Sequence, residues 1–281
     1  MICADDVIKS VLTLPSLPAV VNDLLATMEQ DDFDMQVLAA KITLDQALTA
    51  KTLRLANSSF YGLQSKVTTI GQAVSVLGFH SIRTLVTACS VIASFSAHGS
   101  GTFDFKAFWR HSIASAVCAR VIAPHLQVNP DSAFTAGLLH DLGTLVLATR
   151  FADDYQRVLA WQYEHDCTVS VAERAVFGTD HAAIGAALTA HWKFPEQIQA
   201  AVAGHHLAGP ADCVAPADLT TAVVVANALA HALDLADVEG DQVPPLSMSV
   251  WRALALDNSA WEGVFRNSEQ LFDATCQALI T

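Results

Sequence analysis

The sequence is poor in charged residues, and its few cations are scattered. Charged residues make up 15% of the 281 residues, and 15 Lys and Arg stand against 28 Asp and Glu, for a formal net charge of −13. A nucleic-acid partner normally requires a clustered basic surface that neutralises phosphates. We therefore expect no nucleic-acid partner, and the acidity itself is typical of a soluble protein.

Long uninterrupted apolar runs are also lacking, although 52% of the residues are hydrophobic and the mean hydropathy is +0.37. The most apolar stretch, 221–236, is interrupted by Asn227, His231 and Asp234. A membrane-spanning helix needs about 20 predominantly apolar residues, so we expect no membrane partner. The N-terminus has no basic region followed by an apolar segment, so we expect no signal peptide.

The cysteines form no C-x-x-C pair and no regular spacing. The six are Cys3, Cys89, Cys118, Cys167, Cys213 and Cys276. A chain of this length does not need a disulfide framework, and scattered thiols are typical of a reducing compartment. We therefore expect a cytoplasmic location.

Strand patterns are weak, whereas apolar residues recur at helical spacing along most of the chain. Pro18 precedes one helix, Asp34 and Asp45 are expected to cap the next two, and Thr69 opens another that Gly78 ends. Later helices are expected at about 82–92, 105–123, 130–143, 151–165, 169–177, 181–192, 195–206 and 216–235. The sequence predicts an all-α fold.

The dipeptide His140-Asp141 lies in the apolar run AFTAGLLHDLGTLVLAT. Burial of such a pair is costly unless partners satisfy it, and a metal ion accepts neutral imidazole and carboxylate together. A His-Asp dipeptide alone is weak evidence, because chance supplies about one in this composition. His165-Asp166 is a second example, which we interpret as solvated residues near a helix end.

Other histidines lie in similarly apolar helices and are candidate companions of His140-Asp141. They are His111, His181, His205 and His206. Any one of them alone is more often a satisfied core or surface histidine than a ligand. Together with His140 and Asp141 they make six potential N and O ligands on four separate helices, a set that is less easily explained in that way. The remaining histidines, His231 among them, lack such a setting and are interpreted as structural or exposed.

Several segments together resemble the HDOD family, whose name means HD-related output domain. They are LPSLPAVVNDLL, LDQALTAKTLRLANSSFYG, TIGQAVSVLGFHSIRTLV, FWRHSIASA, AFTAGLLHDLGTLVL and FGTDHAAIGAALTAHWKFPEQIQAAVAGHH. The resemblance implies an all-α HDOD fold and a regulatory role in bacterial signalling, with signalling proteins as partners. The expected division is an N-terminal helical subdomain at 1–100, an HD-like core at 101–236 and a C-terminal helical extension at 237–281.

The C-terminal half is also similar to the HD and HD-GYP phosphohydrolases, whose matching helices bind one or two metals. The likeness implies that the metal ligands would be His111, His140, Asp141, His181, His205 and His206, with Asn227 at the position of a last ligand, usually Asp. Fe, Mn or Zn would be the bound metal.

Three positions depart from those enzymes. Asn227 replaces a carboxylate by a weaker neutral ligand, and Thr144, on the expected pocket rim, stands where a phosphate-binding Lys is common. Ala107 stands where two-metal enzymes often supply Glu, and no Gly-Tyr-Pro follows His206. These departures favour a regulatory domain with a degenerate metal pocket over a catalyst. A metal-dependent phosphohydrolase acting on a nucleotide or cyclic di-nucleotide is the alternative, and a metal or nucleotide sensor without turnover is the third.

Overall fold

A computed structural model describes residues 4–11, 13–14, 16–26, 35–58, 61–96, 103–206, 217–237 and 242–280. Within these ranges the chain is helical and contains no strand, which confirms the all-α prediction. The helices are α1 (Ala4–Val11), α2 (Ala19–Ala26), α3 (Met35–Thr43), α4 (Gln46–Ala56), α5 (Ile70–Ser96), α6 (Phe105–Ile122), a 3₁₀ turn η1 (Ala123–Leu126), α7 (Pro130–Leu139), α8 (Leu142–Arg150), α9 (Ala152–His165), α10 (Val169–Phe177), α11 (His181–His191), α12 (Glu196–Gly204), α13 (Leu219–Ala232), α14 (Met248–Leu254) and α15 (Asn258–Ile280).

Polar side chains begin the helices where the sequence places capping signals. Asp45 accepts a hydrogen bond from the backbone N–H of Leu48 at 2.9 Å and so caps α4. Asn129 caps α7 by accepting from the N–H groups of Asp131 and Ser132, with Pro in the first turn. These bonds satisfy N–H groups that have no partner inside a helix. Asp34, the other expected cap, lies outside the described residues.

Gly78 interrupts α5, as the sequence predicts. Its φ of 81° and ψ of 165° are non-helical, so two helical stretches meet there. Positive φ is the region that glycine adopts without steric cost. Among the described residues, α5 is long and apolar enough to cross a membrane by length and composition, with a hydropathy of 1.5. Because 67% of that window is buried within the molecule, its apolar side chains serve packing.

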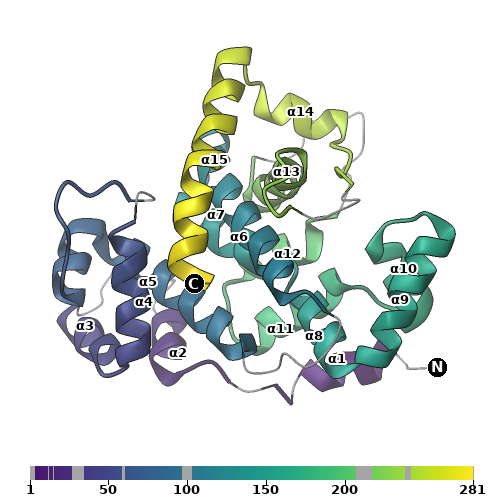
Figure 1. Cartoon of the computed structure of the whole chain (residues 1–281), viewed down its shortest axis with the longest axis horizontal. Helices are drawn as coiled ribbons and strands as arrows, with labels where there is room; N and C mark the ends of the chain where they lie inside the picture. The colour runs from purple at the N-terminus through teal and green to yellow at the C-terminus, as the bar shows by residue number, and fades with distance from the viewer. Residues whose placement is uncertain are drawn as a thin grey trace.

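The helices form a central body with one lobe on each side (Figure 1). Helices α2 to α4 lie on one side with α5, and the α9–α10 pair projects on the other. Helix α6 packs against α7, α13 and α15 in the middle, and α15 also reaches α4 and α5. Helix α1 lies away from α2 to α4, against α8 and α11. The division at residues 100 and 236 stays a prediction.

Helix α7 approaches α6 very closely because Gly137 lies at their contact. A Cβ at Gly137 would come within 2.8 Å of Ala116 Cα and of the Ser115 carbonyl oxygen. Only glycine fits a backbone approach of this kind. The close crossing brings the C-terminal end of α7 toward the face of α6 that carries His111.

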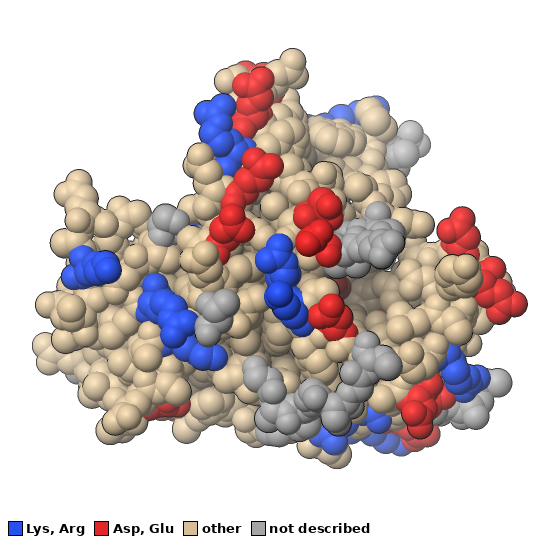
Figure 2. Space-filling model, in the orientation of Figure 1, with Lys and Arg blue, Asp and Glu red and all other residues tan. Residues whose placement is uncertain are grey.

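The charged residues on the face shown in Figure 2 are dispersed. Lys and Arg form separate small groups there, with Asp and Glu at other points of the same face. This distribution matches the scattered cations of the sequence, and the exclusion of a nucleic-acid partner stays a prediction.

Candidate metal centre

His140 and Asp141 lie at a break between two helices. Helix α7 ends at Leu139, His140 is its C-terminal cap, and Asp141 precedes α8 with φ of −101° and ψ of 10°. The sequence interpretation of one continuous helix through Gly143 was wrong. The break turns both side chains toward the same point, which adjacent positions of a continuous helix do less easily.

Two glycines bring α8 against α11 beside this break. A Cβ at Gly143 would lie 2.0 Å from the carbonyl oxygen of His181 and 2.8 Å from the backbone nitrogen of Gly185. A side chain at residue 143 would force the helices apart. The small residues therefore set the distance between Asp141, at the start of α8, and His181, at the start of α11.

The predicted ligands come together from separate elements. His111 lies in α6, His181 is the first residue of α11, and His205 and His206 directly follow α12. His140, His181 and His205 are buried, with relative exposures of 0%, 1% and 2%. His165-Asp166, in contrast, lies exposed at the end of α9, as expected.

One oxygen of Asp141 faces His111 and His140. Asp141 Oδ2 lies 3.5 Å from His111 Nε2 and 3.2 Å from His140 Nε2. The two Nε2 atoms are 3.3 Å apart. We call His111, His140 and Asp141 the His111 group.

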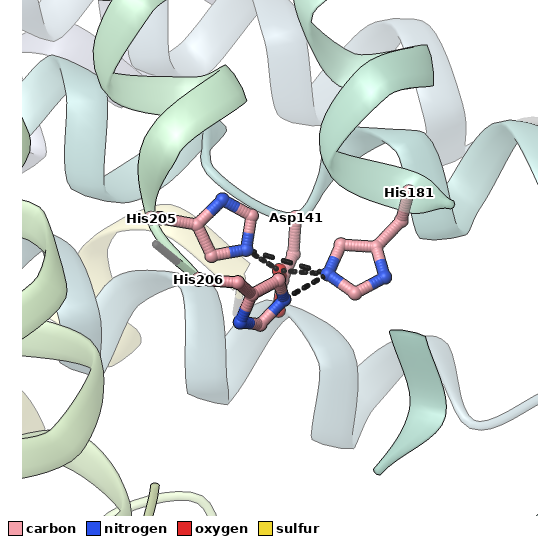
Figure 3. Close-up of side chains that lie close together, drawn as sticks. All are labelled: Asp141, His181, His205 and His206. Atoms are coloured by element: carbon pink, nitrogen blue, oxygen red, sulfur yellow. Dashed lines mark hydrogen bonds and ion pairs between the residues drawn. The ribbon is translucent and has the colours of Figure 1, made fainter. Parts of the chain in front are cut away.

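The other oxygen of Asp141 faces the remaining histidines (Figure 3). Asp141 Oδ1 lies 3.4 Å from His181 Nε2 and 3.2 Å from His205 Nε2. His181 Nε2 is 3.3 Å from His205 Nε2 and 2.6 Å from His206 Nε2. We call Asp141, His181, His205 and His206 the His181 group. The single carboxylate therefore belongs to both groups.

The opposite ring nitrogens fix which atoms face the centre. His140 Nδ1 donates to the Gly137 carbonyl and His205 Nδ1 to the Val202 carbonyl, each at 2.7 Å. Since a carbonyl only accepts, Nδ1 carries the proton and Nε2 keeps its lone pair in the neutral ring. The Nε2 lone pairs of these rings face the oxygens of Asp141, and the two repel each other unless a proton or a cation lies between them.

The spacing of these atoms fits a metal ion. Ligands bound about 2.1 Å from one ion lie roughly 3.0–3.4 Å apart for octahedral to tetrahedral angles. The distances from Asp141 to its four neighbouring Nε2 atoms are 3.2–3.5 Å. The 2.6 Å between His181 Nε2 and His206 Nε2 is shorter than this range, so one of these two rings would have to move on binding an ion. Imidazole with carboxylate suits Zn, Fe and Mn better than it suits Mg or Ca. Both groups therefore could hold a divalent ion.

Burial and charge shift the pKa values of the cluster in different directions. Burial lowers the pKa of His111 to about 3 although Asp141 opposes the shift. Burial alone would raise the pKa of Asp141, but the surrounding imidazoles, His140 first, hold it well below its usual range. Burial also opposes charge on His181, yet Glu173 and Asp141 raise its pKa to about 9. A metal ion bound at His181 Nε2 would replace the proton there.

The two other predicted positions lie on neighbouring helices. Asn227 is on α13 and is buried, with 4% exposure, and its side-chain oxygen has no hydrogen-bond partner in the described part of the chain. Thr144 is half-buried in the first turn of α8, where its N–H bonds the Asp141 carbonyl at 2.9 Å. Their roles stay predictions. The segment after His206 lies outside the described residues.

The sequence reasoning missed two residues beside the cluster. Glu173 on α10 is fully buried and accepts from both the backbone N–H and Nδ1 of His181, at 2.8 and 2.5 Å. His231, which we interpreted as outside the site, has its ring 4.4 Å from that of His111. A glutamate on the buried face of α10, between Ser170 and Phe177, was the available signal for Glu173.

The sequence pattern of the HDOD domain matches residues 14–208. An uncharacterised protein of Treponema pallidum (strain Nichols) is 25% identical over 195 residues, which are 69% of this chain and 37% of that protein. The chain thus spans little more than a third of the length of this relative.

Two solved structures are similar over most of the chain. An HDOD domain protein of unknown function from Geobacter sulfurreducens has a TM-score of 0.73 and 26% identity, covering 94% of this chain and 87% of its own. A candidate phosphohydrolase from Shewanella amazonensis SB2B has a TM-score of 0.69 and 25% identity, covering 94% and 97%. The helical arrangement described above is therefore the arrangement of these proteins.

Proposed function

Because this chain belongs to the HDOD family, we propose that it is a signal-transduction domain whose histidine and aspartate cluster binds two divalent metal ions. One ion would lie in the His111 group and the other in the His181 group, and Fe, Mn or Zn would occupy them. The domain would act through interaction with signalling proteins of a bacterial cytoplasm.

A single observation carries the metal proposal: the two carboxylate oxygens of Asp141 face two different sets of imidazole nitrogens. A carboxylate with only one metal or proton donor to satisfy would not need neighbours on both oxygens. The shared carboxylate supports a pair of ions close together, each with several nitrogen ligands.

A metal-dependent phosphohydrolase is the second candidate, and the paired arrangement favours it. Bound ions would supply Lewis-acid polarisation of a phosphoryl group. The chain's own residues argue the other way. Asn227 and Thr144 stand where the related hydrolases place a carboxylate and a Lys. A regulatory domain, including one that senses metal or nucleotide by binding alone, therefore fits the donor set better than a catalyst.

Elemental analysis of protein purified without chelators tests the proposal. We expect two equivalents of metal in the wild type. Each single variant, His111→Gln or His206→Gln, should keep about one, because it removes a ligand from one group only. Asp141→Asn should keep none, because Asp141 belongs to both groups. His165→Gln, at an exposed histidine outside the cluster, is the matched control and should keep both. A wild-type protein without metal would contradict the proposal.

Hydrolysis assays on the same preparations separate the two candidates. The substrates are a general phosphodiester and cyclic di-GMP, with Mn²⁺ or Fe²⁺ added. Bound metal without turnover supports the regulatory domain. Turnover that disappears in Asp141→Asn supports the phosphohydrolase instead.

A further inference from the structure

We propose that Glu173 is a positioning residue for the His181 group, and that it holds the His181 ring with Nε2 directed at the metal position. This inference rests on the proposed metal binding. Glu173 touches no metal position itself and acts through His181.

Both hydrogen bonds that link the two residues use the same carboxylate oxygen. Glu173 Oε2 accepts from the His181 backbone N–H at 2.8 Å and from His181 Nδ1 at 2.5 Å. The first bond fixes the backbone of His181 at the start of α11, and the second fixes the rotation of its ring. Nε2 is thereby directed at Asp141 Oδ1, 3.4 Å away, and at His206 Nε2.

Capping of α11 alone does not account for Glu173. Asp180 already caps α11, because its side chain accepts from the Ala183 N–H at 3.0 Å. Glu173 is 0% exposed, and its Oε1 atom has no hydrogen-bond partner in the described part of the chain. Apolar residues often stabilise such buried positions better than charged ones do. The charge is therefore better explained by the histidine that it holds.

His181 differs from the other buried histidines in this respect. His140 and His205 direct Nδ1 at backbone carbonyls, whereas His181 directs Nδ1 at a carboxylate. A carboxylate behind a ligating imidazole orients the ring and makes it a stronger donor. Asp141 is the carboxylate shared by both groups, and Asn227 adds no charge. Glu173 therefore supplies a second negative charge, which is separated from the metal position by the His181 ring.

Metal titration of Glu173→Gln in the full chain tests the inference, with Co²⁺ as the probe. The amide keeps the side-chain shape and removes the charge. We expect the affinity of the His181 group to fall 10- to 100-fold, with the visible spectrum of Co²⁺ in that group changed and binding by the His111 group retained. Glu164→Gln is the matched control: it makes the same change at an exposed residue of α9, and both sites should keep wild-type affinity.

The outcomes separate this inference from the proposed function. A wild type that binds no metal overturns both. A folded Glu173→Gln protein with wild-type affinity and an unchanged Co²⁺ spectrum overturns only the role of Glu173. A measurement on zinc-loaded wild type needs no variant: long-range ¹⁵N–¹H spectra should show His181 protonated at Nδ1 and metal-bound at Nε2. Zinc bound at Nδ1 would overturn the inference.

Discussion

At the scale of single residues, Gly143 controls the distance between the two helices that carry Asp141 and His181. Its missing side chain leaves room for the His181 carbonyl oxygen, which a Cβ would approach to 2.0 Å. The atom in the way belongs to the backbone of α11, so it cannot move without shifting the start of that helix. The site geometry therefore depends on a residue that offers no ligand.

Gly143→Ala should destabilise the protein by about 3 kcal/mol, since overpacked sites typically cost ~1–3 kcal/mol and a backbone clash lies at the upper end. It should also lower the metal content of the His181 group. Urea unfolding measures the first effect and elemental analysis the second.

Gly263→Ala is the matched control, because nothing lies within 4 Å of a Cβ at that position in α15. It should raise stability by about 0.5–1 kcal/mol through its better helix propensity. Equal changes in the free energy of unfolding for the two substitutions would show that the contact between α8 and α11 has room for a methyl group at residue 143.

At the scale of helices, α7 lies between the lobe that contains α2 to α5 and the metal centre. At its first turn Asp131 pairs with Arg120 of α6 and accepts from Ser81 Oγ of α5 at 3.2 Å. Arg120 also lies over the ring of Tyr61, 5.2 Å from its centroid. At its other end the same helix is capped by His140. Asp131 thus joins α5 and α6 to the helix that carries His140 at its other end.

Asp131→Ala should lower the free energy of unfolding by about 2 kcal/mol, because hydrogen bonds to charged groups contribute roughly 1.5–3 kcal/mol when they are shielded from water. The two side chains are 22% and 15% exposed, for Arg120 and Asp131 respectively. Urea denaturation followed by circular dichroism gives the measurement.

Asp154→Ala provides the comparison, since Asp154 also lies in the first turn of a helix and pairs with an arginine, Arg157, that is 67% exposed. Its effect should stay within about 0.5 kcal/mol. A loss at Asp131 no larger than the loss at Asp154 would mean that the α5–α6–α7 junction does not depend on this charge.

The helices were predictable where local signals decide them. Caps such as Asp45 and breakers such as Gly78 act within a few residues. The break at His140-Asp141 was not predictable in this way. His140 keeps helical angles, φ −56° and ψ −38°, and the chain departs from them only at Asp141, φ −101° and ψ 10°. Asp141 is a residue type that often begins helices, but its side chain accepts no capping hydrogen bond there.

The candidate ligands were predictable because imidazoles in apolar helices are conspicuous and resemble a known pattern. Glu173 and His231 were not, because their importance comes from neighbours on other helices, α11 and α6. Sequence periodicity gives the buried face of one helix but not the partner that packs against it.

At the scale of the molecule, the ligands come from positions spread over residues 111–206 and from four places in the fold. An unfolded chain does not hold them together, so metal binding favours the folded state. Stability should therefore rise with free metal concentration, by about 2.7 kcal/mol at 100 times the dissociation constant.

Calorimetry with and without EDTA measures this linkage. The unfolding temperature of the wild type should fall by several degrees when metal is removed, whereas Asp141→Asn should unfold at the same temperature in both conditions. An unfolding temperature of the wild type that is the same with and without EDTA would contradict the linkage.

The position of α1 has a consequence for the order of events during synthesis. This helix is made before the surface that it packs on, because it lies against α8 and α11, and α11 ends about 180 residues later. At 5–20 residues per second, the ribosome needs roughly 10 to 40 seconds to complete that surface. During this interval Val7 and Val11, which are fully buried in the folded protein, have no surface to cover them. Helix α1 therefore leaves the ribosome well before the helices that cover it, and it packs only after α11 has been made.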